Sequence, residues 1–91
     1  MTLAALKREL KVGTVIECLP GHVQTWSVGV PRTVRIAQTN AIAVDLVDKD
    51  TGKVVEDKVS WLYWPKASEV VYDADAGTFT VNGSMSYRIV R

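Results

Sequence analysis

The chain has 91 residues, 47% of them hydrophobic and 23% charged, and its formal net charge is +1. This length is typical of one domain, and the composition excludes a disordered chain. The balanced charge argues against the basic excess of nucleic-acid binders, and no apolar run approaches the roughly 20 residues that span a bilayer. The single Cys18 cannot form an intramolecular disulfide, so a cytoplasmic location is expected.

The N-terminal segment has helical periodicity. Leu3, Leu6 and Leu10 recur at three- and four-residue spacing, and Gly13 stands where a helix would end. We predict a helix near residues 3–11 within an N-terminal part of residues 1–13. A helix this short must dock its Leu stripe, on its own sheet or alternatively on a partner. Because the segment lacks an apolar h-region, no secretory signal is expected.

From Thr14 onward the periodicity is two, which is typical of strands. Strands are predicted over residues 14–19, 23–30, 32–38, 41–48, 53–62 and 69–72. The second is expected to be irregular, because Gly29 and Pro31 interrupt it. Residues 32–38 and 41–48 form the most regular predicted hairpin, in which Val34 and Ile36 point to the same face.

Two positions predict interruptions of the next strand. Asp57 falls on the apolar face of residues 53–62, so we expect a bend or bulge there. Trp64 and Pro65 end the strand, and Pro65 favours a single helical or 3₁₀ turn through residues 66–68.

The C-terminal segment predicts a hairpin around Asn82-Gly83. A two-residue loop would put Phe79 and Val81 opposite Ser84 and Ser86 and separate the two apolar sets. We therefore predict a three-residue loop of residues 81–83, with Gly83 left-handed, that pairs Phe79 with Met85.

These elements predict a single domain over residues 1–91, with the sheet or barrel formed by residues 14–91. The fold class is mainly β (α+β). We expect a small, strongly curled antiparallel sheet, or an SH3- or OB-like barrel, of roughly five to seven short strands with one N-terminal helix. The alternative is a half-open sheet with the helix packed on one face.

No constellation of residues indicates catalysis or metal binding. His22 is the only histidine, and Cys18 with His22 supplies only two ligands where structural zinc sites use four. Asp48–Gly52 superficially looks like a calcium loop, but Val59 stands where the bidentate Glu is required. We therefore expect a non-enzymatic protein without cofactor or metal.

The most unusual feature is the aromatic segment of residues 60–66. On a strand, Trp61 and Tyr63 lie on one face, while Leu62 and Trp64 lie on the other. Either both faces are buried under the helix, or one Trp is displayed for binding. Trp26 is the next candidate for display. Positive charge beside these aromatics could come from Arg32, Arg35, Lys58 and Lys66.

Three segments carry a resemblance in layout: residues 6–14 (LKRELKVGT), residues 32–34 (RTV) and residues 60–67 (SWLYWPKA). In these segments the chain looks like small uncharacterised β-rich proteins encoded by bacteriophages and mobile elements. The resemblance implies a context, because such accessory proteins often bind and block a host protein, as anti-CRISPR inhibitors do. It carries over no functional residue.

The sequence thus predicts a protein-binding module, expected as a phage or mobile-element accessory protein that inhibits or modulates a host protein. Its predicted binding residues are Trp26, Trp61, Tyr63, Trp64, Lys66, Arg32 and Arg35. The alternative is a nucleic-acid-binding small β-barrel that uses the same aromatics with Arg32, Arg35 and Lys58. No membrane partner is expected, and monomer and homodimer both stay open.

Overall fold

The structure is a computed structural model, and it describes residues 3–20, 26, 28–48 and 50–91. The elements are α1 (Leu3–Glu9), β1 (Val15–Cys18), β2 (Arg32–Ala37), β3 (Ala41–Val47), β4 (Val54–Tyr63), the 3₁₀ turn η1 (Ala67–Glu69), β5 (Val70–Asp73), β6 (Thr78–Val81) and β7 (Met85–Val90). Of the predicted second strand, only Trp26 and residues 28–30 are described. Val28 there forms a single bridge with Cys18, and the rest of that prediction lies outside the described residues.

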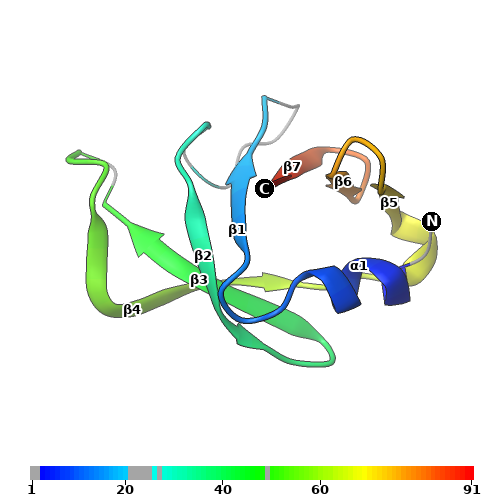
Figure 1. Cartoon of the computed structure of the whole chain (residues 1–91), viewed down its shortest axis with the longest axis horizontal. Coiled ribbons are helices and arrows are strands. Elements are labelled where there is room, and N and C mark those ends of the chain that lie inside the picture. Colours follow the sequence, from blue (N-terminus) through cyan, green and yellow to red (C-terminus); the bar gives the residue numbers. More distant parts are fainter. Residues whose placement is uncertain (1–2, 21–25, 27, 49) are drawn as a thin grey trace.

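The seven strands form one antiparallel sheet in the order β4-β3-β2-β1-β7-β6-β5. The sheet is strongly curled, so that it wraps about halfway around a common core (Figure 1). The predicted fold class, a curled antiparallel sheet with one N-terminal helix, is confirmed. Within the described residues β4 and β5 do not pair with each other, so the curl remains an open half-barrel.

Helix α1 lies across the opening of the curl (Figure 1). Its Leu6 side chain, and that of Leu10 just beyond it, are fully buried in the core. The helix packs against β5 on one side. On the other side the Nζ of Lys7 donates a hydrogen bond to the carbonyl of Thr39, between β2 and β3, at 2.6 Å. The Leu stripe therefore docks on the domain's own sheet, as the first interpretation predicted.

The β2–β3 hairpin forms where predicted, but it contains a bulge. Val34 pairs with Val44 and Ile36 pairs with Ala43, so Arg35 is an extra residue in β2. A bulge reverses the alternation of the strand. Val34 consequently faces the core while Ile36 is 37% exposed on the opposite face. The prediction that these two residues share a face is wrong for this reason.

Strand β4 bends sharply (Figure 1). Asp57 has a left-handed backbone with φ of 60°. The ladder with β3 shifts register across this region, between the pairs Asp45–Val59 and Val47–Val54. The interruption predicted at Asp57 is confirmed. Downstream, the predicted single helical or 3₁₀ turn after Pro65 forms as η1, one residue later than the predicted residues 66–68.

The C-terminal hairpin has a three-residue loop, but one residue later than predicted. Val81 pairs with Met85, and Phe79 pairs with Tyr87 rather than with Met85. Asn82 and Gly83 both adopt left-handed backbones, with φ of 55° and 67°. Because Asn tolerates this conformation, the loop begins after Val81, which stays in the ladder and is fully buried. The single apolar face that motivated the prediction is retained.

Candidate functional site: the outer face of strand β4

The aromatic segment of β4 divides between the two faces of the sheet. Leu62 is buried, and Trp64, just after the strand, packs edge-on against Phe79 with ring centroids 6.1 Å apart. Trp61 and Tyr63 point the other way and are 37% and 69% exposed. The interpretation in which both faces of the segment are buried is therefore wrong, and the interpretation in which one Trp is displayed is confirmed by the exposure of Trp61.

The two displayed aromatics stack on each other. Their ring centroids are 6.2 Å apart and their planes differ by 25°. Since they are two residues apart on one strand, this stacking restricts the rotamers of both side chains. A pre-ordered aromatic pair loses less conformational entropy on contact with a partner than two free side chains would.

Neighbouring strands extend this surface. Ile36 and Trp61 both pair with Ala43, and Val59 pairs with Asp45, so Ile36 and Val59 share the outer face with the aromatics. We call Ile36, Val59, Trp61 and Tyr63 the outer-face patch. Ala43 itself is fully buried, because the small side chain is surrounded by larger neighbours. Ile36 could not be found from the sequence, since its exposure depends on the bulge at Arg35.

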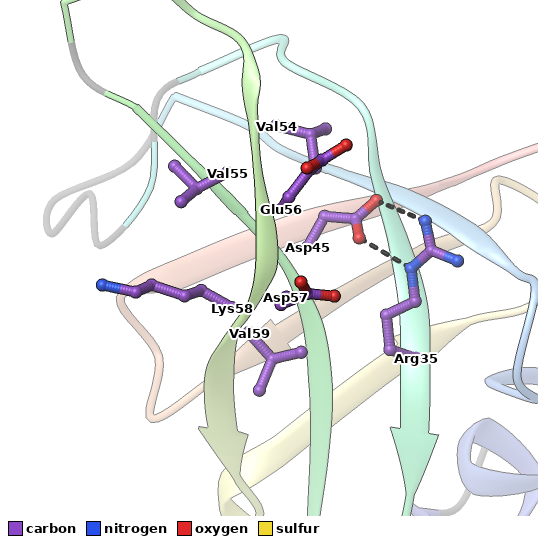
Figure 2. A pocket seen from close by; sticks show the side chains of 8 residues that line it. All are labelled: Arg35, Asp45, Val54, Val55, Glu56, Asp57, Lys58 and Val59. Atoms are coloured by element: carbon purple, nitrogen blue, oxygen red, sulfur yellow. Dashed lines mark hydrogen bonds and ion pairs between the residues drawn. The ribbon is translucent and has the colours of Figure 1, made fainter.

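Next to this patch, the bend of β4 forms a cavity of about 440 Å³ (Figure 2). Its lining consists of Arg35, Asp45, Val54, Val55, Glu56, Asp57, Lys58 and Val59. Figure 2 shows the carboxylates of Glu56 and Asp57 on the same side of β4 as Arg35 and Asp45, whereas Val55 and Lys58 extend to the other side. The cavity is continuous with the outer-face patch through Val59.

Arg35 and Asp45, which both line this cavity, form an ion pair. The Nε of Arg35 donates to Oδ1 of Asp45 at 2.7 Å, and Nη2 donates to Oδ2 at 3.3 Å. The Asp45 residue is buried whereas Arg35 is exposed. The hydrogen bond to Asp45 raises the pKa of Arg35 above its ordinary value. The carboxylate of Asp45 therefore holds the guanidinium of Arg35 in place.

Two of the predicted binding residues lie inside the domain. Trp26 is 8% exposed, and its Nε1 donates to the Oγ of Ser60 at 3.2 Å. Its ring centroid lies 5.0 Å from that of Tyr87. The guanidinium carbon of Arg32 lies 4.8 Å from the Trp26 centroid, and Arg32 is 4% exposed. Burial lowers the pKa of Arg32. The predicted display of Trp26 is wrong, because its ring fills the core between Arg32 and Tyr87.

The remaining predicted residues lie near the patch or apart from it. Trp64 is half-buried and contributes mainly to the core, while Lys66 is exposed just before η1. Lys58 follows the acidic pair Glu56-Asp57 at the bend. The structure thus brings together Trp61, Tyr63 and Arg35 from the prediction, and adds Ile36, Val59 and Asp45.

Cys18, His22 and the acidic residues are the side chains that the sequence offers for metal binding or catalysis. Within the described ranges, no group of three or more His, Cys, Asp or Glu side chains could hold a metal ion. Cys18 is buried, with its Sγ at 3.6 Å from the carbonyl of Leu19. His22 lies outside the described residues.

In the part of the chain that the structure describes, no helix has the length and apolarity needed to cross a membrane.

Comparisons with protein-family models, curated proteins and solved structures each gave no match for this chain. The fold places the protein in the broad class of small, mainly β domains with a strongly curled antiparallel sheet. What bears on its function is therefore the geometry of the β4 face itself.

Proposed function

We propose that the protein is a non-enzymatic protein-binding module that contacts its partner through the outer-face patch of β4. The observation that carries this proposal is the stacked pair Trp61 and Tyr63, which is displayed although the domain has a core in which aromatic rings pack. Trp and Tyr are the residues most enriched in the energetic centres of protein interfaces.

The composition of the surroundings also fits a protein contact. Ile36 and Val59 add aliphatic area beside the rings. The Arg35–Asp45 ion pair lies next to them and offers a fixed donor and acceptor array at the rim. An apolar centre bordered by polar groups is the usual anatomy of a protein–protein interface.

Two of the three cations named for the nucleic-acid alternative are engaged by other groups of the domain. Arg32 is buried against Trp26, and the charge of Arg35 is matched by that of Asp45. Lys58 is adjacent in sequence to Asp57, and both line the acidic bend. These neighbours weaken the positive potential that phosphate binding requires. We therefore do not propose nucleic acid as a second candidate partner. Binding of nucleic acid is instead one of the results that would contradict the proposal in the experiment described below.

The biological setting is proposed from the sequence resemblance. The protein acts as an accessory protein of a phage or mobile element and inhibits or modulates a host protein, in the manner of anti-CRISPR inhibitors. A patch made of rigid aromatics, without catalytic groups, is sufficient for inhibition by occlusion, since such inhibition requires binding alone.

Tyr63→Ser and Trp61→Ser test the proposal, with Val71→Ser as the matched control. Val71 lies on the opposite edge strand β5 and is 68% exposed, which is close to the 69% of Tyr63. The tagged protein captures its partner from host lysate, and the affinity of each variant for the purified partner is then titrated. We expect losses of roughly thirtyfold or more for the two aromatic variants and little change for the control.

Two results would contradict the proposal. One is a partner protein that binds Tyr63→Ser and Trp61→Ser as tightly as the wild type. The other is a nucleic acid as the bound species, with an affinity that falls steeply as salt rises.

A further inference from the structure

The backbone of β4 has one side that β3 does not use. The N–H of Trp64 donates to the carbonyl of Asn40 at 2.8 Å, so these two residues form a hydrogen-bonded pair. Hydrogen-bonded and non-hydrogen-bonded pairs alternate along an antiparallel ladder. The continuous pairing of residues 59–63 with β3 therefore directs the N–H and C=O groups of Val59, Trp61 and Tyr63 away from β3.

This free edge is open to an added strand. β4 is the last strand of the sheet, and among the described residues β3 is the only strand beside it. Within the same residues, no backbone hydrogen bond from outside the ladder reaches Val59, Trp61 or Tyr63. Exposed edges are normally blocked by charged residues, bulges or proline. Residues 59–63 contain neither a charge nor a proline, and the bulge lies upstream of them.

The same segment displays most of the outer-face patch. Val59, Trp61 and Tyr63 supply both the outward backbone groups and three of the four side chains of the patch. Neighbouring strands lie about 4.8 Å apart, and every second side chain of a strand points to the same face. A strand added at this edge therefore places alternate side chains directly beside Trp61 and Tyr63. One extended segment can satisfy the backbone groups and contact the aromatic rings together.

We propose that the partner protein supplies an extended segment, which pairs antiparallel with the free edge of β4 at residues 59–63. This inference rests on the proposed function and specifies the kind of partner, namely one with a free strand or an unstructured segment of apolar alternation. All the ladders of this sheet are antiparallel, and antiparallel pairing is slightly more stable per residue. The backbone bonds give affinity, and the side chains beside the aromatics give specificity.

The area that can be buried favours a partner protein over a second copy of this chain. If two copies paired edge to edge, their patches would lie side by side on one face and would stay uncovered. That contact involves only residues 59–63 of each copy, whereas a stable interface has roughly 20–30 residues per side. A partner whose segment continues into a folded body covers the edge and the patch together.

Lys58 gives the bound segment a charge preference. Figure 2 shows the Lys58 side chain on the free side of β4, whereas the carboxylates of Glu56 and Asp57 lie on the side of Arg35. No carboxylate of the described residues forms an ion pair with Lys58. Opposite charges on neighbouring strands are favourable. In antiparallel pairing, an acidic residue at the C-terminal end of the segment therefore fits beside Lys58.

A synthetic peptide tests the edge without knowledge of the partner. Acetyl-Thr-Val-Thr-Val-Thr-Glu-amide is titrated into ¹⁵N-labelled protein and followed by the amide signals. We expect the signals of Val59, Trp61 and Tyr63 to shift more than those of Ser60 and Leu62, whose N–H groups bond to β3. The same peptide with N-methylated backbone nitrogens is expected to bind at least tenfold more weakly, because it has lost its donors. Equal binding of the two peptides, or no shift of the edge signals, would overturn the inference.

A charge exchange tests the orientation of the segment. A peptide with Lys in place of its Glu is expected to bind roughly threefold more weakly to the wild type. Lys58→Glu is expected to reverse this preference. If Lys58→Glu leaves the preference unchanged, the antiparallel placement beside Lys58 is wrong.

Val59→Pro and Val59→Thr test the edge with the partner captured from lysate. The proline removes one outward N–H but no bond of the β3 ladder, whereas the threonine keeps that N–H. We expect Val59→Pro to bind the partner roughly tenfold more weakly than Val59→Thr, with a wild-type circular dichroism spectrum. If Tyr63→Ser loses the partner while these two variants bind it equally, the proposed function stands and this inference is wrong.

Sedimentation equilibrium of the free protein separates the partner from a second copy. We expect the wild type to stay monomeric at the concentrations used for the titrations. A dimer that forms in the wild type and is lost in Val59→Pro would assign the edge to a second copy and overturn the inference.

Discussion

Arg32 brings a cationic side chain into the core of the domain. Its guanidinium lies over the Trp26 ring, and no group of the described residues accepts a hydrogen bond from its Nε. A desolvated cation–π contact is worth about 2 kcal/mol. Removing a charged group from water costs several kcal/mol unless the group is well paired. Burial lowers the pKa of Arg32, because its effect exceeds the Coulombic effects of Cys18, Tyr87 and Asp45 that favour the charge.

Arg32→Met is therefore expected to stabilise the fold. The variant keeps the length and most of the apolar contact of the side chain, and we expect the free energy of unfolding to rise by about 1 kcal/mol in urea denaturation. Arg35→Met is the control. We expect it to lower the free energy of unfolding, since it leaves the buried carboxylate of Asp45 without its partner. A clear loss of stability in Arg32→Met would show that the cation–π contact dominates.

Single residues of the site were predictable only where the strand pattern is regular. Period-two alternation correctly separates Trp61 and Tyr63 from Leu62, because β4 is straight over residues 59–63. The same reasoning fails for Ile36, where the bulge at Arg35 reverses the faces. It also fails for Trp26, which belongs to the predicted irregular strand of residues 23–30, where Gly29 and Pro31 interrupt the alternation. The burial of Trp26 depends on contacts with Ser60 and Tyr87, which are distant from it in the sequence.

At the scale of elements, the connections β3–β4 and β5–β6 share a local design. Residues 48–52 and 73–77 have the sequences DKDTG and DADAG. In both, the first Asp accepts two backbone hydrogen bonds through Oδ1, and the carbonyl of that Asp accepts one from the Gly four residues later. Gly52 and Gly77 have φ of 70° and 71°. Two hairpins on opposite sides of the curl thus use the same Asp-and-Gly turn.

Asp48→Ala and Asp73→Ala are each expected to lower the free energy of unfolding by about 1 kcal/mol. The carboxylate of each residue satisfies turn N–H groups, as a helix N-cap does, and its loss has a similar cost. Asp50→Ala and Asp75→Ala are the matched controls, because those side chains accept no such bond from the described residues. Urea denaturation of the four variants measures the difference, and equal effects in all four would contradict this role.

Local rules also decided which elements were predictable. Asp57 on an apolar face correctly predicts the bend of β4, since a polar side chain cannot be accommodated there without a change of backbone. The C-terminal loop is predicted with the right length but the wrong start. The requirement for one apolar face fixes the length alone. The left-handed backbone of Asn82 then fixes where the loop begins.

The whole molecule depends on contacts between the two ends of the chain. β1 pairs with β7 over residues Val15–Cys18 and Tyr87–Val90, and this ladder joins the β4-β3-β2 half of the sheet to the β7-β6-β5 half. Period-two patterns identify strands, but they do not specify which distant strands pair. The class of curled sheet could therefore be predicted from the sequence. Its strand order, and the choice between a closed barrel and the half-open alternative, could not.

Helix α1 completes the core that the open sheet leaves uncovered, so we expect its loss to affect both halves at once. Leu6→Ala is expected to lower the free energy of unfolding by about 3 kcal/mol, because Leu6 is fully buried in the shared core. This is a large part of the stability of about 5–15 kcal/mol that is usual for a domain. Val12→Ala is the control, since Val12 is exposed.

The same variant tests whether the curl unfolds as one unit. Far-ultraviolet circular dichroism follows the whole sheet, and tryptophan fluorescence follows Trp26, Trp61 and Trp64. The core cluster includes residues of α1 and of all seven strands, so both signals should shift together in Leu6→Ala and keep a single transition. Separate transitions for the two signals would show that the two halves fold independently and that α1 does not couple them.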